Sequence, residues 1–305
     1  MGQMDGILII DKPEGMTSHD VVARLRRILK VKKIGHTGTL DPFATGVLVM
    51  LVGKATRLAR FLDRDIKEYD ALINFGYETD TGDRTGTRKE TEAVMEQKQI
   101  TPEDLIRVIA EFMGEIKQVP PMYSAKKVDG KKLYEFARKG EEIDRDPIDV
   151  TIFKIQISQD RIPAEPAPGT WNLRLLIKCS AGTYIRTLAE DIGRELGPRA
   201  HLGELRRTGA GRFDLSQAFS LDDLERHDDP ASLLIPMSEA VSDLAEMRLD
   251  AERVRRTLDG LSTGFVDEAV NDGDAVRMID ENGKLIAIGT FCSGDNVVQP
   301  KVVLG

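Results

Sequence analysis

Residues 35–46 concentrate the side chains of this chain that are most able to do chemistry. The segment GHTGTLDPFATG holds His36 and Asp41 among three glycines and three threonines, immediately before an apolar stretch. One interpretation is a structural turn, in which the Asp41 carboxylate accepts backbone N–H groups ahead of Pro42. The other is a reactive carboxylate, which can act as a nucleophile or as a base. The residues by themselves leave both interpretations open.

Phosphate-binding and metal-binding chemistry do not fit this segment. A phosphate loop would end in Gly-Lys followed by Ser or Thr, and the segment has no such ending. Only His36 and Asp41 are good metal ligands here. Cys179 and Cys292 lie far apart in the sequence, so they form neither a disulfide framework nor a zinc site alone. We therefore expect no metal.

A second group of residues is suited to an anionic partner. The stretch 120–145 mixes lysines with Tyr123 and Tyr134, and a later pair of arginines lies in the string LGELRR. Such a run is either a solvated face or an RNA-binding loop, because RNA loops offer phosphates to lysine and unstacked bases to aromatic rings. The candidate RNA contacts are Lys126, Lys127, Lys131, Lys132, Arg206 and Arg207.

Charge is unevenly distributed along the chain. The net charge of −8 argues against a nucleic-acid partner when it is taken alone. Residues 221–305, however, carry 8 Lys and Arg against 18 Asp and Glu, a balance of −10, which leaves +2 for residues 1–220. The larger part of the chain can therefore carry a basic groove for RNA.

Length and composition narrow the class of protein. A chain of 305 residues suggests two domains. No run of about 18 apolar residues occurs, which excludes a membrane-spanning helix. The N-terminus lacks a basic stretch followed by a long apolar segment, so we expect no secretory signal. With only two cysteines, we expect the protein in the reducing cytoplasm.

Apolar periodicity predicts the elements that must position these side chains. We expect a strand before Pro13, a helix over 18–31 capped by Thr17 or Ser18, and a turn-rich segment over 35–46. A composition shift between about residues 221 and 245 includes a linker at 227–232, followed by a small β-rich domain. The further expected helices cover 54–64, 101–116, 133–140, 182–197 and 249–260, and the strands cover 47–53, 68–77, 150–157, 170–180, 274–280, 284–291 and 301–304.

Several blocks of the sequence resemble one known family. GHTGTLDPFATGVL is similar to the catalytic signature of the bacterial tRNA pseudouridine-55 synthases, the TruB family. The blocks GILIIDKPEGMTS, EYDALINFG, TDTGDRTG, VPPMYSAKKVDGKKLYEFARKG and CSAGTYIRTLAEDIG, followed by HLGELRRT, occur in the same order as in that family. Together the blocks cover nearly all of residues 5–215.

The resemblance implies a fold and a domain organisation. The fold would be α+β, the pseudouridine synthase fold, with a mixed, mainly antiparallel sheet and flanking helices. Residues 1–240 would form the catalytic domain, with an RNA-gripping insertion at about 120–145. Residues 246–305 would form a small β-rich, PUA-like RNA-binding domain, although its acidic balance argues against strong phosphate contacts.

The resemblance also implies an activity. The enzyme would isomerise uridine 55 in the T loop of tRNA to pseudouridine, without a cofactor or a metal. The target base would be flipped into a pocket before the chemistry. tRNA would be the partner, with no membrane and no protein partner, and the protein would be a monomer. The family also suggests that the protein assists tRNA folding.

Site roles follow residue by residue from the resemblance. Asp41 would be the catalytic nucleophile or base, and Arg186 would pair with it and keep it ionised and oriented. The remaining substrate-binding residues would be His36, which displaces the target base, Tyr69, which stacks on the uracil, and Tyr184 and Leu205, which line the pocket.

Two rival functions remain at this point. One is an RNA chaperone, for which isomerisation is incidental. The other is a glycosidic-bond hydrolase, which would need a second carboxylate to activate water, and none is evident near Asp41.

Overall fold

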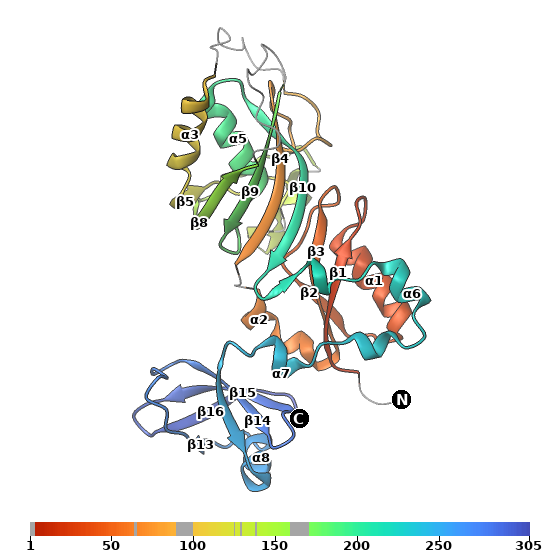
Figure 1. Cartoon of the computed structure of the whole chain (residues 1–305), viewed down its shortest axis with the longest axis vertical. Coiled ribbons are helices and arrows are strands. Elements are labelled where there is room, and N and C mark those ends of the chain that lie inside the picture. Colours follow the sequence, from red (N-terminus) through yellow and green to blue (C-terminus); the bar gives the residue numbers. More distant parts are fainter. Residues whose placement is uncertain are drawn as a thin grey trace.

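Two β-sheets organise the computed structural model, which describes residues 4–63, 66–89, 100–124, 126–128, 130–137, 139–158 and 171–305. A sheet of nine strands forms the larger body, and a sheet of five strands forms a smaller C-terminal domain (Figure 1). The described strands of the large sheet follow the order β1-β3-β10-β4-β9-β8-β5, with β2 added to β3 and β11 added to β10.

The large sheet is mixed and mainly antiparallel. Among the described strands, β3 and β10 pair in parallel and every other neighbouring pair in this sheet is antiparallel. This arrangement confirms the α+β fold class. The strands are β1 Gly6–Lys12, β2 Ile34–Thr37, β3 Thr45–Val52, β4 Lys67–Phe75, β5 Gly114–Gln118, β8 Ile148–Ile157, β9 Asn172–Cys179, β10 Ala200–Ala210 and β11 Phe213–Asp214.

Three helices, α1, α3 and α5, cover one face of this sheet. α1, Ser18–Leu29, begins at a capping box in which Thr17 and Asp20 satisfy each other's backbone N–H groups. α3, Pro102–Glu111, begins at the same motif, formed by Thr101 and Asp104. α5, Ile185–Leu196, packs beside α3 against the sheet (Figure 1). The apolar faces of the three helices join the strands in one core.

The short elements lie mostly at the edges of the body. After β3 the chain forms a 3-10 helix, η1 Gly53–Leu58, and the short helix α2 Ala59–Leu62. Between β5 and β8 lie β6 Lys127–Val128, β7 Lys131–Lys132 and α4 Leu133–Ala137, for which the side chains of residues 127, 128, 131, 132 and 134 are not described.

Residues 215–240 return along β1 instead of forming a free linker. The expected linker at 227–232 lies among short turns and helices: η3 Leu215–Gln217, α6 Leu221–Arg226, η4 Pro230–Leu233 and α7 Met237–Ala240. Backbone hydrogen bonds join Ile7 to Ile235 in both directions, at 2.9 and 2.8 Å. Phe219 also bonds to the backbone of Ile9 and Asp11. The segment thereby covers the edge of the large sheet.

The C-terminal domain contains β12 Ala245–Leu249, α8 Ala251–Leu258, β13 Thr263–Gly264, β14 Ala275–Asp280, β15 Leu285–Cys292 and β16 Val297–Val303. Its sheet follows the order β12-β14-β15-β16-β13. One group of buried apolar residues joins this domain to the body, because Leu285, Ile288 and Leu304 share a cluster with Leu51 and Leu58.

Several strands differ from the sequence prediction. β2 was expected as part of a turn, and the strands that were not predicted are β5, β6, β7, β10, β11, β12 and β13. The predicted helix 101–116 ends at Glu111, because Gly114 adopts a φ of +89° and starts β5. Within the described part of the chain, no helix is both long and apolar enough to cross a membrane.

Candidate active site

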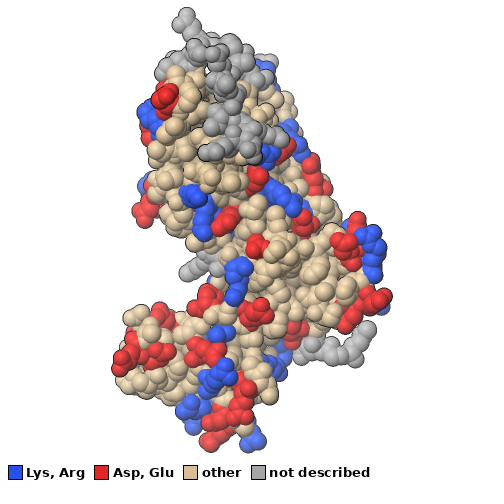
Figure 2. All heavy atoms as spheres, in the orientation of Figure 1, with Lys and Arg blue, Asp and Glu red and all other residues tan. Residues whose placement is uncertain are grey.

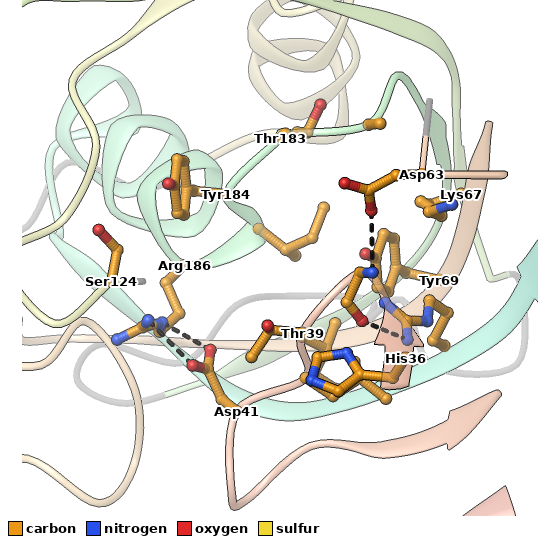
Figure 3. Close-up of a pocket in the computed structure, with 17 residues that line it drawn as sticks. His36, Thr39, Asp41, Asp63, Lys67, Tyr69, Ser124, Thr183, Tyr184 and Arg186 are labelled. Carbon is orange, nitrogen blue, oxygen red and sulfur yellow. Dashed lines mark hydrogen bonds and ion pairs between the residues drawn. The ribbon is translucent and has the colours of Figure 1, made fainter. Parts of the chain in front are cut away.

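One cavity of about 540 Å³ brings together the residues singled out by the sequence (Figure 3). It opens between the loop that follows β2, the start of α5 and the strands β4 and β10. The predicted residues that line it are His36, Asp41, Tyr69, Tyr184, Arg186, Leu205 and Arg207. Residues more than 140 positions apart in the sequence thus share one site.

Asp41 and Arg186 form a bidentate ion pair. Nε of Arg186 lies 3.0 Å from Oδ2 of Asp41, and Nη2 lies 3.2 Å from Oδ1. The guanidinium is almost fully buried, whereas the Asp41 side chain keeps 32% of its surface exposed. Arg186 also donates to the carbonyl oxygens of Thr81 and Tyr123. These bonds fix the guanidinium, which in turn fixes the orientation of the carboxylate.

Burial raises the pKa of the Asp41 carboxyl above its usual value, and Arg186 opposes that shift by stabilising the ionised form. The neighbouring Asp83 raises the pKa further, and Lys12 lowers it. A carboxylate with a raised pKa is a stronger base and nucleophile than an aspartate in water. The electrostatics therefore suit a reacting group as well as a structural one.

The loop that carries Asp41 is held at several backbone positions. The Ser18 hydroxyl accepts the Leu40 N–H at 3.0 Å and lies 3.2 Å from the Leu40 carbonyl oxygen, to which it donates. The Pro42 carbonyl accepts the Gly15 N–H at 2.8 Å and the Lys12 ammonium at 3.3 Å. The residues on both sides of Asp41 are therefore tied to the start of α1 and the end of β1.

Lys12, which was not predicted from the sequence as a site residue, contacts the loop that carries Asp41. Its side chain is fully buried, and it donates to the carbonyls of Pro13 and Met16 as well as Pro42. Burial lowers the pKa of Lys12 to about 8, although Asp41 acts in the opposite direction. A charged residue in the apolar run ILIIDK is the sequence signal that could have identified it.

Arg207 is buried and does not contact solvent as a surface arginine would. We expected it beside Arg206 as a phosphate contact, but only 1% of its surface is exposed. Its guanidinium donates to the carbonyls of Val47 at 2.6 Å and Gly38 at 2.8 Å, and it bonds to the Tyr69 hydroxyl. The Arg207 guanidinium therefore holds the backbone of Val47 and Gly38 in place. The phosphate contact expected for Arg207 is wrong, because the side chain is buried.

Tight packing at Gly46 explains how β3 approaches this arginine. A Cβ atom on Gly46 would lie 2.2 Å from the Arg207 carbonyl oxygen. Glycine is therefore required where the two parallel strands meet. The partly exposed neighbour Arg206 points elsewhere and forms a bidentate pair with Asp11, at 3.0 and 2.7 Å.

Two tyrosines line the cavity with most of their surface buried. Burial raises the pKa of both Tyr69 and Tyr184. Gln118 holds the Tyr184 backbone, accepting its N–H at 2.9 Å and donating to its carbonyl at 3.3 Å. Ser124 lines the same cavity as Tyr184. Both hydroxyls are thus neutral at physiological pH, and both rings are fixed in place.

His36 and Leu205 complete the predicted set. The His36 ring lies at the cavity edge and meets the exposed His19 ring edge-on, with centroids 5.6 Å apart. Leu205 is buried on β10 opposite Ala71 of β4. In Figure 3 the Asp41–Arg186 pair lies at one end of the cavity, and Asp63 and Lys67 lie at the other end, beyond Tyr69.

Asp63 and Lys67 were not predicted as site residues. Oδ1 of Asp63 accepts the Gly38 N–H at 3.0 Å, and Lys67 is buried at the cavity wall. Alternation along β4 places Lys67 on the same face as Tyr69, and this signal could have identified it. Within the described part of the chain, no three His, Cys, Asp or Glu side chains gather into a metal-binding group.

Among the candidate RNA contacts of residues 120–145, Lys126 has a described side chain, and it does not line this cavity. Lys126 is half-buried, while the side chains of Lys127, Lys131 and Lys132 fall outside the described part. Two residues at the start of the same stretch do reach the site, because the Tyr123 carbonyl accepts from Arg186 and Ser124 lines the cavity.

Comparisons with known proteins show the family to which the chain belongs. The family model described as "TruB family pseudouridylate synthase (N terminal domain)" matches residues 26–185, and "tRNA pseudouridylate synthase B C-terminal domain" matches residues 186–242. The tRNA pseudouridine synthase B of Halalkalibacterium halodurans is 40% identical over 305 residues, covering 99% of this chain and 98% of that protein. The protein of the same name from Solibacter usitatus is 40% identical over 308 residues, covering 99% and 100%.

Solved structures superimpose on nearly the whole chain. A chain of the "H/ACA RNP bound to a substrate RNA containing 2'-deoxyuridine" superimposes with a TM-score of 0.74 at 26% identity, covering 99% of this chain and 86% of that chain. A chain of the "Cbf5-Nop10-Gar1 Complex" superimposes with a TM-score of 0.74 at 27% identity, covering 99% and 85%. The chain belongs to the TruB family of pseudouridylate synthases and is an isomerase.

Proposed function

We propose that this enzyme converts a uridine of tRNA to pseudouridine, and that the uridine is position 55 in the T loop. The relatives that share 40% identity over nearly the whole chain are named for tRNA, which supports this substrate. The observation that carries the proposal is the bidentate Arg186–Asp41 pair in a cavity that Tyr69 and Tyr184 also line.

The reaction needs one carboxylate and no external reagent. The bond between N1 of uracil and C1′ of ribose breaks, the base turns, and a bond forms between C5 and C1′. The hydrogen leaves C5 and N1 acquires one, so the product is an isomer of the substrate. In one route Asp41 attacks the ribose or the base covalently, and in the other it removes a ribose proton. Both routes require the ionised carboxylate that Arg186 stabilises.

The cavity has the size and the walls for one flipped nucleoside. Its volume of about 540 Å³ falls within the usual range for small-molecule sites. Flipping a base out of an RNA loop costs a few kcal/mol, which stacking on an aromatic ring partly repays. Tyr69 is the candidate stacking surface, Leu205 supplies apolar contact, and His36 at the edge would displace the target base from the loop. These roles form part of the proposal.

Product analysis on defined tRNA transcripts tests the function. The enzyme is incubated with unmodified tRNA and with the same tRNA in which uridine 55 is replaced by cytidine, and the digested nucleosides are separated. We expect pseudouridine from the first RNA and none from the second. Free uracil would identify a hydrolase instead. Unchanged nucleosides together with accelerated tRNA folding would identify a chaperone without isomerase activity, and pseudouridine from both RNAs would contradict position 55.

A further inference from the structure

Residues 21–62 form a strongly basic stretch within an acidic chain. They contain nine Lys and Arg but a single acidic residue, Asp41, which gives a balance of +8 in a chain of net charge −8. Residues 120–145, by comparison, carry seven Lys and Arg against five Asp and Glu. The positive charge is therefore concentrated in the segment that surrounds the candidate catalytic loop.

The fold gathers this charge on one group of adjacent elements. The C-terminal half of α1, the connection to β2, the helix η1 and the helix α2 all contact β2 or one another. Figure 1 places β2 and α2 near the junction between the large sheet and the C-terminal domain. We call this group the basic surface and define it by Arg26, Arg27, Lys30, Lys32, Lys33, Lys54, Arg57 and Arg60.

Within the described residues, no member of the basic surface forms an ion pair with a side-chain carboxylate, although Glu225, whose pKa is lowered chiefly by Arg24, also interacts with the charge of Arg27. Seven of the members are exposed, and Lys54 is half-buried. Many Lys and Arg side chains elsewhere in the described structure form ion pairs with carboxylates. Arg24 pairs with Asp222 and Glu225, and Arg174 pairs with Asp70 and Glu204. Several like charges held close together repel each other, and an anionic partner relieves that repulsion.

Backbone contacts hold part of the surface in place. Arg26 donates to the carbonyl of Ile34 at 3.3 Å, and Arg57 donates to the carbonyl of Val303. Lys54 donates to the carbonyl of Gly305 at 3.0 Å. A repeating polyanion fits such an array better than a single small anion does.

The basic surface adjoins β2, which reaches the cavity, although none of its members lines the cavity. β2 carries His36 to the cavity edge, and the same strand contacts α1, η1 and α2. A nucleotide that enters the cavity therefore leaves its flanking backbone close to β2. The C-terminal domain offers less positive charge, since residues 245–305 hold seven Lys and Arg against eleven Asp and Glu, and acidic side chains are spread over that domain in Figure 2.

We propose that the basic surface binds the phosphate backbone of the RNA substrate and supplies most of the salt-dependent part of its affinity. The inference rests on the proposed function, because it takes the partner to be the tRNA that enters the cavity. Each phosphate contact contributes roughly 0.7 to 0.9 to the slope of log affinity against log salt. The salt slope is therefore the direct measure of this surface.

The test compares three sets of substitutions in the full chain. The first is Arg27→Gln, Lys32→Gln and Lys33→Gln, three exposed members without a side-chain hydrogen bond in the described structure. The second, Arg27→Lys, Lys32→Arg and Lys33→Arg, keeps the charges. The third, Arg255→Gln, Lys284→Gln and Lys301→Gln, removes three exposed cations from the C-terminal domain. Folding of each variant is checked by circular dichroism.

Affinity for unmodified tRNA is then measured at several salt concentrations. We expect the first set to weaken binding roughly 10-fold or more and to reduce the slope by about 2, with the second and third sets close to the parent. An unchanged slope in the first set, or an equal loss in the third, would overturn the inference and assign the surface to another partner. Pseudouridine formation by the parent is scored separately, so a failure of the proposed function is distinguishable.

Discussion

Lys12 shows how a single buried charge can support a reacting group. Its ammonium holds the Pro42 carbonyl, directly after Asp41, and lowers the pKa of that aspartate. Three carbonyl oxygens accept hydrogen bonds from the Lys12 ammonium. They do not offset the cost of removing its charge from water, so the pKa of Lys12 falls to about 8.

Lys12 makes a prediction for stability against pH. Its pKa is about 8 in the folded chain and near 10.5 when unfolded, so the unfolded chain binds more protons between these two pH values. The free energy of unfolding of the parent should therefore rise relative to Lys12→Met as the pH increases from about 8 to about 10.5. Urea unfolding at several pH values measures this difference. The exposed Lys284→Met is the control, and a parent-to-Lys12→Met difference that stays constant over this range would contradict the prediction.

At the scale of elements, the Asp41 loop depends on the start of α1. The buried Ser18 hydroxyl both accepts from and donates to the Leu40 backbone. Ser18→Ala leaves two buried backbone groups without this partner, which costs about 1–3 kcal/mol. Because the loop also loses its position, we expect kcat to fall roughly 10- to 100-fold.

A second capping serine, Ser220, provides a control that distinguishes a loss of loop position from a general loss of stability. Ser220 caps α6 by accepting the Asp223 N–H at 3.1 Å, on a helix away from the cavity lining. Ser220→Ala should cost about 0.5–2 kcal/mol, with kcat retained. Steady-state kinetics and thermal unfolding of both variants measure the two effects. An equal loss of kcat in both variants, or none in Ser18→Ala, would contradict a positioning role for Ser18.

Local signals predicted some elements and missed others. The cap expected at Thr17 or Ser18 predicted where α1 begins, because a cap acts within one turn, and the structure places the cap at Thr17. β10 was missed because its strand state depends on pairing with β3 and β4, which no short window of sequence contains. β2 was missed because its residues lead into a turn-rich segment, although they pair with β3.

The site residues also divide into those with a local sequence signal and those that depend on long-range pairing. The Asp41–Arg186 pair was expected from family resemblance, since nothing local connects two residues so distant in the sequence. Burial of Arg207 was not expected, because its neighbour Arg206 is partly exposed and pairs with Asp11, and only the register of β10 separates them. Side-chain direction along a strand alternates, and it is known only once the register is known.

At the scale of the whole molecule, the two sheets share buried apolar side chains. Leu304, at the C-terminus, belongs to the cluster that contains Leu51 and Leu58 of the body. Removing residues 246–305 would therefore expose apolar surface of the body as well as remove the acidic domain. The C-terminal domain thus contributes to stability, whatever it contributes to RNA binding.

The single tryptophan makes this coupling measurable. Trp171 stacks on Phe75 in the large sheet, with ring centroids 3.9 Å apart, so its fluorescence reports unfolding of the body. Leu304→Ala should destabilise the body by about 2–4 kcal/mol and lower the Trp171 unfolding midpoint. The exposed Val266→Ala should leave that midpoint nearly unchanged. A midpoint that does not move in Leu304→Ala would show that the two sheets unfold independently.

The proposed isomerisation depends on the carboxylate of Asp41. Asn has nearly the same size and keeps one carbonyl acceptor, so Asp41→Asn should preserve the loop, but it removes the charge that nucleophilic and basic catalysis require. The most direct measurement is pseudouridine formation in a single turnover, with enzyme in excess over unmodified tRNA. We predict that Asp41→Asn binds the tRNA about as well as the parent and forms no pseudouridine. Pseudouridine formed by Asp41→Asn at more than a small fraction of the parent rate would contradict the central claim.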